Sequence, residues 1–207
     1  MNVAAAALAL AMVPASVEAL SRRRSLDPER LRKVVHVGAA PIVAALPLFV
    51  SYGEIAALGL LFAFVMAVSR RLGIFRAVHG VGRETHGEIL YPLGLAAAAL
   101  LFPDGTAFVY AVLVVGLADG LAAPVGQRYG RRRLPGGKSV WGSTTFFAIS
   151  LAVGASVLLA GGAKPLYALA AAATSAAALT ATEAFLSGGL DNAVLPPLAG
   201  ALISVAA

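Results

Sequence analysis

The sequence predicts an all-α membrane protein, a polytopic bundle of about seven or eight helical spans that forms one transmembrane domain over residues 1–207. Three observations predict this fold class. The chain is 59% hydrophobic and only 13% charged, whereas soluble domains carry about 25% charged residues. Its apolar residues form successive runs close to the roughly 20 residues that a helix needs to cross a bilayer. Its charged residues gather in the short segments between these runs.

The composition also indicates which ligands and partners the chain can have. Only 7% of the residues are aromatic, so small residues carry much of the hydrophobicity and allow membrane helices to pack closely. The absence of cysteine excludes disulfides and cysteine-ligated metals. A net charge of +6 is explained in a membrane protein by Lys and Arg in cytoplasmic loops. We therefore expect the lipid bilayer as a partner, and no nucleic acid.

The expected spans follow the apolar runs in chain order. The second begins at Asp27-Pro28-Glu29, because Asp is a favourable N-cap, Pro suits the first helical position and Glu favours the positive end of the helix dipole. Turns rich in Gly and Pro separate several later runs. Spans are expected at residues 3–20, 28–50, 55–69, 88–102, 106–125, 142–160, 165–185 and 193–206, the last one short and irregular at Pro196-Pro197.

The first run is expected to be a retained span with its N-terminus outside the cell. A cleaved signal peptide carries its positive charges before the apolar segment, whereas here they follow it. Residues 1–25 would then form a peripheral span and basic loop, and residues 30–200 the catalytic core.

The positive charges predict the orientation in the cell membrane. The loops at 21–33, 70–87 and 126–139 hold six, four and five Lys and Arg residues, all but one of the sixteen in the chain. These loops alternate with nearly uncharged turns, which marks their side as cytoplasmic. The polar residues that could carry chemistry lie on this same face.

Asp119 is the first candidate functional residue. It lies seven residues before Gly126 in an apolar span, which places it roughly 10 Å below the helix end. A carboxylate at that depth is costly and usually functional. One interpretation is a ligand of Mg²⁺, which prefers carboxylate and phosphate oxygens; the other is an ion pair with an arginine of the nearby loop.

The segment 135–144, PGGKSVWGST, predicts a phosphate-binding loop. It is not a P-loop, because that motif requires glycine where Arg132 stands. Its glycines still expose backbone N–H groups, Lys138 supplies a positive charge, and Ser143 or Thr144 is expected to cap a helix whose dipole favours an anion. The alternative is a solvated loop that only sets topology. The candidate phosphate-binding residues of this segment are Gly137, Lys138, Ser139, Gly142 and Ser143, and Gly126 at the end of the preceding span is another.

The remaining candidates are a basic cluster and three acids. Arg32, Lys33 and His36 lie three or four residues apart on one helix, so their side chains are neighbours; they either bind phosphate or mark a basic helix end. Glu88 is a second metal ligand or a helix-start acid, Glu183 is buried enough to need a partner, and Asp191 with Asn192 is a further metal ligand or a turn.

These residues resemble the CTP-dependent lipid-alcohol kinases, a family with dolichol kinase, phytol kinase and the CTP-using diacylglycerol kinase. The resemblance covers residues 30–200 and rests on Arg32-Lys33-x-x-His36, Gly87-Glu88-Ile-Leu-Tyr-Pro-Leu-Gly94, Ala118-Asp119-Gly120, Gly126-x-x-x-Gly130, Gly137-Lys138-Ser139-x-x-Gly142-Ser143, Glu183 and Asp191-Asn192. It implies transfer of the γ-phosphoryl group of CTP to a lipid hydroxyl with a divalent metal, with polyprenol, dolichol or phytol as acceptor. It also implies that Arg32, Lys33, Asp119 and Lys138 are critical for activity.

Several alternatives stay open at this point. Diacylglycerol is another acceptor, and cytidylyl transfer to a lipid phosphate is another reaction, although the basic His-Gly-Gly signature of phosphatidate cytidylyltransferases is absent. A small-solute transporter is the non-enzyme alternative, against which the crowding of polar residues on one face argues. The Gly116-x-x-x-Gly120 pair packs helices either within one chain or in a homodimer.

Overall fold

The computed structural model describes residues 2–23, 27–79, 85–134 and 136–206. Parts of two predicted basic loops, 24–26 and 80–84, and Pro135 of the predicted phosphate-binding loop lie outside the described residues. Within them the chain is helical and contains no β-strand, only an isolated bridge between Arg133 and Ser139. The predicted all-α class is confirmed.

The helices succeed one another along the chain with short connections. They are α1 (Val3–Arg23), α2 (Pro28–Ala45), the 3-10 turn η1 (Leu46–Leu48), α3 (Tyr52–Arg71), α4 (Arg76–His79), α5 (Gly87–Leu101), α6 (Gly105–Leu113), the π-helical segment η2 (Val114–Asp119), α7 (Gly120–Tyr129), α8 (Val140–Ala160), α9 (Pro165–Phe185) and α10 (Leu190–Ser204). Segments α6, η2 and α7 form one continuous span.

Six helices of the described chain are long and apolar enough to cross a membrane. They are Val3–Ser21, Pro28–Leu48, Tyr52–Arg71, Gly105–Tyr129, Val140–Ala160 and Pro165–Phe185, with Gly87–Leu101 as a shorter apolar helix. Large apolar side chains such as Phe64 and Leu166 are 68% and 81% exposed, which a bilayer explains better than water does. The protein is an integral membrane protein.

Three expectations about local structure are corrected. The last helix begins at Leu190 rather than 193 and continues through Pro196 and Pro197 without a break. Prolines are tolerated in membrane helices because neighbouring groups compensate for the lost hydrogen bonds, and α10 packs closely on α5, α6 and α9. The expected loop 70–87 contains the short helix α4. The cap of α8 is Ser139, not Ser143 or Thr144.

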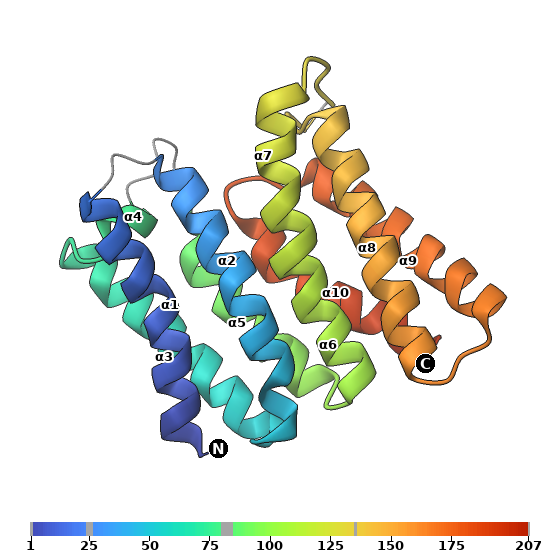
Figure 1. Cartoon of the computed structure of the whole chain (residues 1–207), viewed down its shortest axis with the longest axis horizontal. Helices are drawn as coiled ribbons and strands as arrows, with labels where there is room; N and C mark the ends of the chain where they lie inside the picture. The colour runs from blue at the N-terminus through green and yellow to red at the C-terminus, as the bar shows by residue number, and fades with distance from the viewer. Residues whose placement is uncertain (1, 24–26, 80–84, 135, 207) are drawn as a thin grey trace.

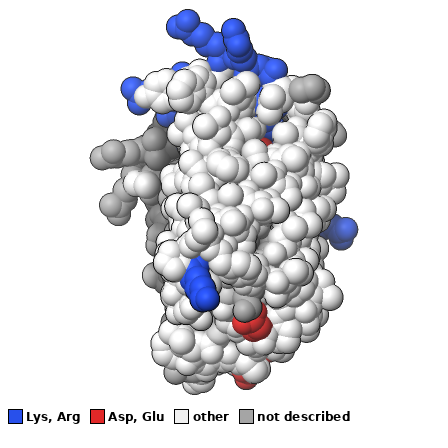
Figure 2. Space-filling model, turned by 90° about the vertical axis from the view of Figure 1, so that its right-hand side faces the viewer, with Lys and Arg blue, Asp and Glu red and all other residues white. Residues whose placement is uncertain are grey.

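The polar ends of the helices gather at one end of the bundle. Figure 1 shows the starts of α2, α5, α8 and α10 at the same end as the loop between α7 and α8, with both chain termini toward the other end. Figure 2 shows Lys and Arg side chains crowded at this end, whereas the surface below is mostly uncharged and carries only scattered charged side chains. The basic loops, which alternate with nearly uncharged turns along the sequence, thus come together at one end of the bundle.

Close packing between α2 and the continuous span α6–η2–α7 brings the two main polar segments together. A Cβ atom added at Gly116 would overlap with Ala40, and one added at Gly120 would overlap with Val37. Small residues of this kind let membrane helices approach at backbone distance. The Gly116-x-x-x-Gly120 pair is therefore used within the chain, against α2.

Candidate active site

A polar cavity of about 220 Å³ lies at the end of the bundle where the basic loop is found. Segments α2, η2, α7, α8, α9 and α10 and the loop before α8 contribute to its wall. The lining residues are Glu29, Lys33, Asp119, Ala122, Ala123, Gly126, Gln127, Arg133, Gly137, Lys138, Ser139, Gly142, Ser143, Glu183 and Asp191. Most of the residues singled out in the sequence meet here, although they come from segments up to about 160 residues apart in the chain.

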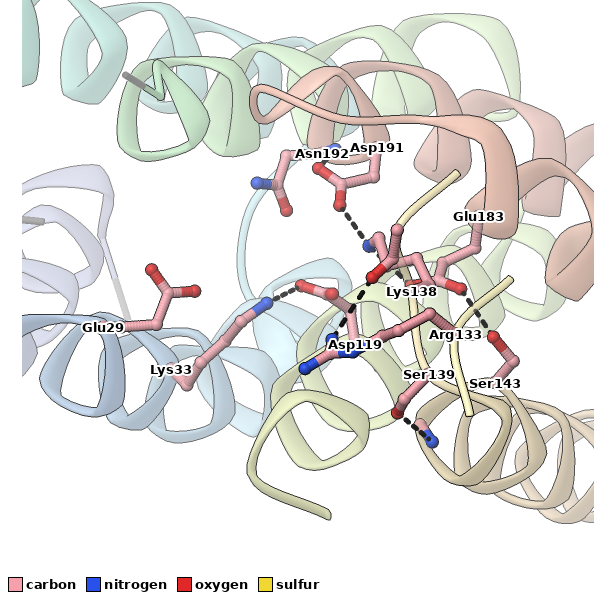
Figure 3. A network of polar contacts seen from close by, with 12 residues as sticks. Glu29, Lys33, Asp119, Arg133, Lys138, Ser139, Ser143, Glu183, Asp191 and Asn192 are labelled. Atoms are coloured by element: carbon pink, nitrogen blue, oxygen red, sulfur yellow. Dashed lines mark hydrogen bonds and ion pairs between the residues drawn. The ribbon is translucent and has the colours of Figure 1, made fainter. Parts of the chain in front are cut away.

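Asp119 and Lys33, which both line this cavity, form a buried ion pair (Figure 3). Lys33 lies on the first turns of α2 and Asp119 ends η2, and their side chains are 7% and 4% exposed. The alternative interpretation of Asp119 was an ion pair with an arginine, whereas the structure pairs it with a lysine. A π-helical segment inside an α-helix is often found at functional sites, and here it carries the carboxylate.

Lys138 lies between two further carboxylates. Its Nζ donates to Glu183 Oε1 at 2.6 Å and to Asp191 Oδ2 at 3.1 Å. Burial alone would lower the pKa of Lys138, but the nearby carboxylates of Asp191, Glu183 and Asp119 raise its pKa above the usual value. Lys138 therefore stays positively charged at physiological pH and joins α9 and α10 to the loop.

The loop before α8 holds Lys138 in place through a tight turn. Leu134 N donates to Lys138 O at 2.7 Å, and Gly137 adopts a φ of 84°, a left-handed conformation that glycine accepts without strain. Arg133 Nη1 donates to Gly137 O at 3.2 Å. The glycine is required here because a side chain at this φ would be strained.

The start of α8 forms another wall of the cavity. Ser139 accepts a hydrogen bond from Gly142 N at 3.0 Å, and Ser143 Oγ donates to Glu183 Oε2 at 3.5 Å. A Cβ atom at Gly126 would lie 2.5 Å from Ser139 Oγ, so only glycine lets α7 approach this cap. The backbone N–H groups at such a helix start favour an anion.

Glu88 lies outside this cavity. Its Oε1 accepts from Arg70 Nη1 at 2.8 Å and lies 3.2 Å from His79 Nδ1, and Arg70 Nη1 also donates to Thr85 O at 2.7 Å. The structure thus ties Glu88 to α3 and α4 and separates it from the other candidate carboxylates.

Arg32 and His36 are buried on another side of α2 from Lys33. Each is 2% exposed. Arg32 Nη2 donates to Glu29 Oε1 at 2.7 Å, and the His36 ring stacks on Tyr91 with centroids 4.1 Å apart. The three basic residues of the motif Arg32-Lys33-x-x-His36 therefore lie in two different environments, because consecutive positions of a helix face different directions.

Three polar lining residues were missed in the sequence. Glu29 was interpreted only as a helix-start acid, Arg133 only as part of a topology-setting basic run, and Gln127 was not considered. The available signal for Glu29 was its spacing of four residues from Lys33 on one helix. Arg133 and Gln127 carry no comparable spacing.

Comparison with known proteins identifies a relative that is an enzyme. No protein-family model and no solved structure matches the chain. The chain is 34% identical over 206 residues to the phytol kinase of Synechocystis sp., and the match covers 96% of this chain and 88% of the relative. The chain therefore belongs to the family of lipid-alcohol kinases that includes phytol kinase, and it is a phosphotransferase that acts on an alcohol group.

Proposed function

We propose that this protein transfers the γ-phosphoryl group of CTP to the hydroxyl of a membrane isoprenoid alcohol, with phytol as the first candidate and polyprenol and dolichol as others. The observation that carries the proposal is the polar cavity, in which two lysines, an arginine, four carboxylates and the start of α8 converge. The kinase relative supports phytol as acceptor. The choice of CTP over ATP is supported by the resemblance in the sequence.

The charges of the cavity fit a nucleotide that carries a divalent metal. Lys33, Arg133 and Lys138 face Glu29, Asp119, Glu183 and Asp191. Arg32 pairs with Glu29 from outside the cavity, so these groups leave no excess of positive charge. A bare triphosphate would be repelled by the acids, whereas a phosphate-bound Mg²⁺ would be attracted to them. No group of three His, Asp or Glu side chains in the described residues could hold a metal ion, but Mg²⁺ usually takes one or two carboxylates and completes its shell with substrate phosphates and water.

The residues of the cavity then have separate roles. Asp119 and Asp191 are the proposed Mg²⁺ ligands, and the metal would neutralise phosphate charge. Lys33, Lys138 and the N–H groups at the start of α8 would bind the phosphate oxygens. Phosphoryl transfer depends mainly on such positioning and electrostatic stabilisation.

The reaction needs one proton acceptor. The alcohol oxygen bonds to the γ-phosphorus, the bond from that phosphorus to the bridging β–γ oxygen breaks, and CDP leaves. The hydroxyl proton passes to a carboxylate, for which Glu183 and Glu88 are the candidates. Glu183 lines the polar cavity, whereas Glu88 lines the neighbouring apolar one.

We also propose that the site faces the cytoplasm. The basic loop between α7 and α8 lies at the same end as the polar cavity, and Lys and Arg of short loops remain on the cytoplasmic side of membrane proteins. CTP is then reached from the cytoplasm and the alcohol from the adjacent leaflet.

A phosphoryl-transfer assay tests this function. The purified full-length protein in detergent receives Mg²⁺, γ-labelled CTP or ATP, and one of phytol, geranylgeraniol, a polyprenol or diacylglycerol. We expect label in the phosphate of an isoprenoid alcohol with CTP. Label with ATP only would contradict CTP as the phosphoryl donor. Label in diacylglycerol only would contradict an isoprenoid alcohol as the acceptor.

Two further outcomes would replace the proposal. Release of pyrophosphate with a lipid phosphate as substrate would indicate cytidylyl transfer. Solute flux in liposomes without nucleotide, together with no nucleotide binding, would indicate a transporter.

A further inference from the structure

A second cavity, of about 100 Å³, lies among α1, α2, α3 and α5. Its wall is almost entirely apolar and includes Leu10 of α1, Val43 of α2, and Leu58 and Met66 of α3. Near the starts of α2 and α5 the wall becomes polar, because it is lined there by Arg32, His36, Glu88 and Tyr91. The cavity is thus a hydrocarbon space with one polar end.

The polar end contains side-chain atoms without hydrogen-bond partners. Among the described residues, Arg32 Nε and Nη1, His36 Nδ1 and Tyr91 Oη are buried and unpaired. Arg32 and His36 are 2% exposed and Tyr91 is 7% exposed. Leaving such groups unpaired away from water is costly, so their grouping indicates a ligand. A hydroxyl group fits, since it donates one hydrogen bond and accepts others.

This polar end adjoins the phosphate cavity. A Cβ atom at Gly87 would overlap with Arg32 Nη1 and lie 2.7 Å from Asn192 Nδ2, so Arg32 approaches the residue next to Asp191. Arg32 Nη2 also donates at 2.7 Å to Glu29, which lines the polar cavity together with Lys33. A hydroxyl held beside Arg32 and His36 would therefore be close to a phosphoryl group held beside Lys33.

The apolar cavity also has a side that is weakly closed. Helix α1 packs on α2 and α4 but barely contacts α3, within the described residues. Both α1 and α3 nevertheless line the cavity, and α1 is the least buried of the six candidate spans. A hydrocarbon chain can therefore leave between α1 and α3 toward the bilayer.

We propose that this cavity binds the hydroxyl-bearing end of the acceptor alcohol, a site that rests on the proposed kinase function. Arg32, His36 and Tyr91 hydrogen-bond the hydroxyl, and the rest of the chain passes between α1 and α3 into the membrane. A dry cavity of about 150 Å³ binds benzene, which has six carbons, so about 100 Å³ accommodates the first few carbons beside the hydroxyl, with the remainder in lipid.

Equilibrium binding without nucleotide tests the recognition of the hydroxyl. The full-length protein in phosphatidylcholine nanodiscs binds tritiated phytol, which is then displaced by unlabelled phytol or by phytane, the same hydrocarbon without the hydroxyl. We expect phytane to compete at least about tenfold more weakly, because a site with unpaired polar groups rejects a ligand that lacks the hydroxyl. Equal competition would overturn the proposal.

A matched pair of variants tests the location. Leu58→Trp fills the cavity, whereas Leu60→Trp places the same side chain on the outside of α3; Leu58 is 3% exposed and Leu60 is 53% exposed. We expect phytol affinity to fall about tenfold or more in the first variant and to stay within about twofold in the second, as expected for overpacking of a bound site. CTP binding, measured in both, reports whether the polar cavity is intact.

Labelling of the unmodified chain gives a result even if Leu58→Trp does not fold. A phytol analogue with a diazirine beside the hydroxyl should label residues of α2, α3 or α5 that line the apolar cavity. Label in the open groove between α2 and α7, at Val37, Leu121 or Pro124, would overturn the proposed location.

The two proposals fail in different ways. Phytol binding as described, without phosphoryl transfer from any nucleotide, would remove the kinase function and leave an alcohol-binding cavity. Phosphoryl transfer to phytol that is unchanged in a folded Leu58→Trp protein would keep the kinase function and remove the cavity.

Discussion

The two cavities on either side of the start of α2 differ in how their polar groups are compensated. In the polar cavity, Lys33 and Lys138 are each paired with carboxylates. In the apolar cavity, Arg32, His36 and Tyr91 carry atoms without partners. The first arrangement suits a charged ligand that exchanges ion pairs with the protein, and the second suits a neutral ligand that supplies missing hydrogen bonds.

The largest effect is expected from Asp119→Asn, which acts only on the polar cavity. We expect kcat/KM to fall about 1,000-fold, because Asp119 is a proposed Mg²⁺ ligand and a bound metal contributes several kcal/mol of transition-state stabilisation. Phytol binding should fall far less than turnover, because Asp119 does not line the apolar cavity. The measurement is steady-state transfer from labelled CTP, with phytol binding in parallel.

Asp104→Asn is the matched control for that variant. Asp104 caps α6 at the far end of the same span, accepting from Thr106 N and Ala107 N, and Asn caps about as well as Asp. Activity should be retained. Full turnover in a folded Asp119→Asn protein would contradict the assigned role of the polar cavity.

A smaller loss is expected from Lys138→Met. Removing one charged donor to the transferring phosphate should lower kcat about 100-fold, and the loss of the ion pairs with Glu183 and Asp191 should also loosen the junction of α9 and α10. Arg131→Gln, an exposed change in the same loop, should stay within about twofold. An equal loss in both variants would show that general loop charge, rather than Lys138, is responsible.

Gly116→Ala tests whether the two cavities depend on one close helix contact. The added methyl group would overlap with Ala40 on α2 and should destabilise the protein by about 1–3 kcal/mol, while weakening nucleotide and alcohol binding together. Gly53→Ala meets nothing within 4 Å and serves as control. Thermal unfolding and the two binding assays measure this, and a loss confined to one ligand would argue against a shared contact.

The smallest effect is expected from Tyr91→Phe. The Tyr91 hydroxyl has no partner among the described residues, so its removal should leave stability unchanged and raise the KM for the alcohol a few-fold. Tyr110→Phe is the opposite case, because Tyr110 Oη lies 2.9 Å from Ser175 Oγ. It should cost about 1 kcal/mol of stability without changing that KM. If Tyr91→Phe lowers stability and not alcohol affinity, the hydroxyl site is wrong.

Most helices of the bundle could be predicted because the sequence features that specify them, apolar runs and helix-start residues, are local. A long apolar run needs only its own length to predict a span, and the expected span at 165–185 coincides with α9. The helix start at Asp27-Pro28-Glu29 was also predicted, since α2 begins at Pro28. The continuous helix through Pro196 and Pro197 was not predicted, because the packing that tolerates these prolines comes from distant segments.

The sequence predicted which residues belong to the site better than it predicted how those residues pair. Buried charge in an apolar span is costly wherever the span lies, so Asp119 and Glu183 could be recognised as residues that need partners. The sequence did not tell which cations would be those partners, and the structure supplies Lys33 and Lys138. Glu88 illustrates the limit, because it resembles the other acids in sequence yet pairs with Arg70 and His79.

The sequence by itself determined that this chain is a helical membrane protein with its charges on one face, because hydropathy and charge act residue by residue. Only the tertiary structure decided that Arg32 and Lys33, adjacent in the chain, line different cavities. Successive residues of a helix point in different directions, and what each direction meets depends on how closely α2 packs on Gly116 and Gly120. That contact joins residues some 80 positions apart, and it is set by packing across the bundle rather than by local sequence.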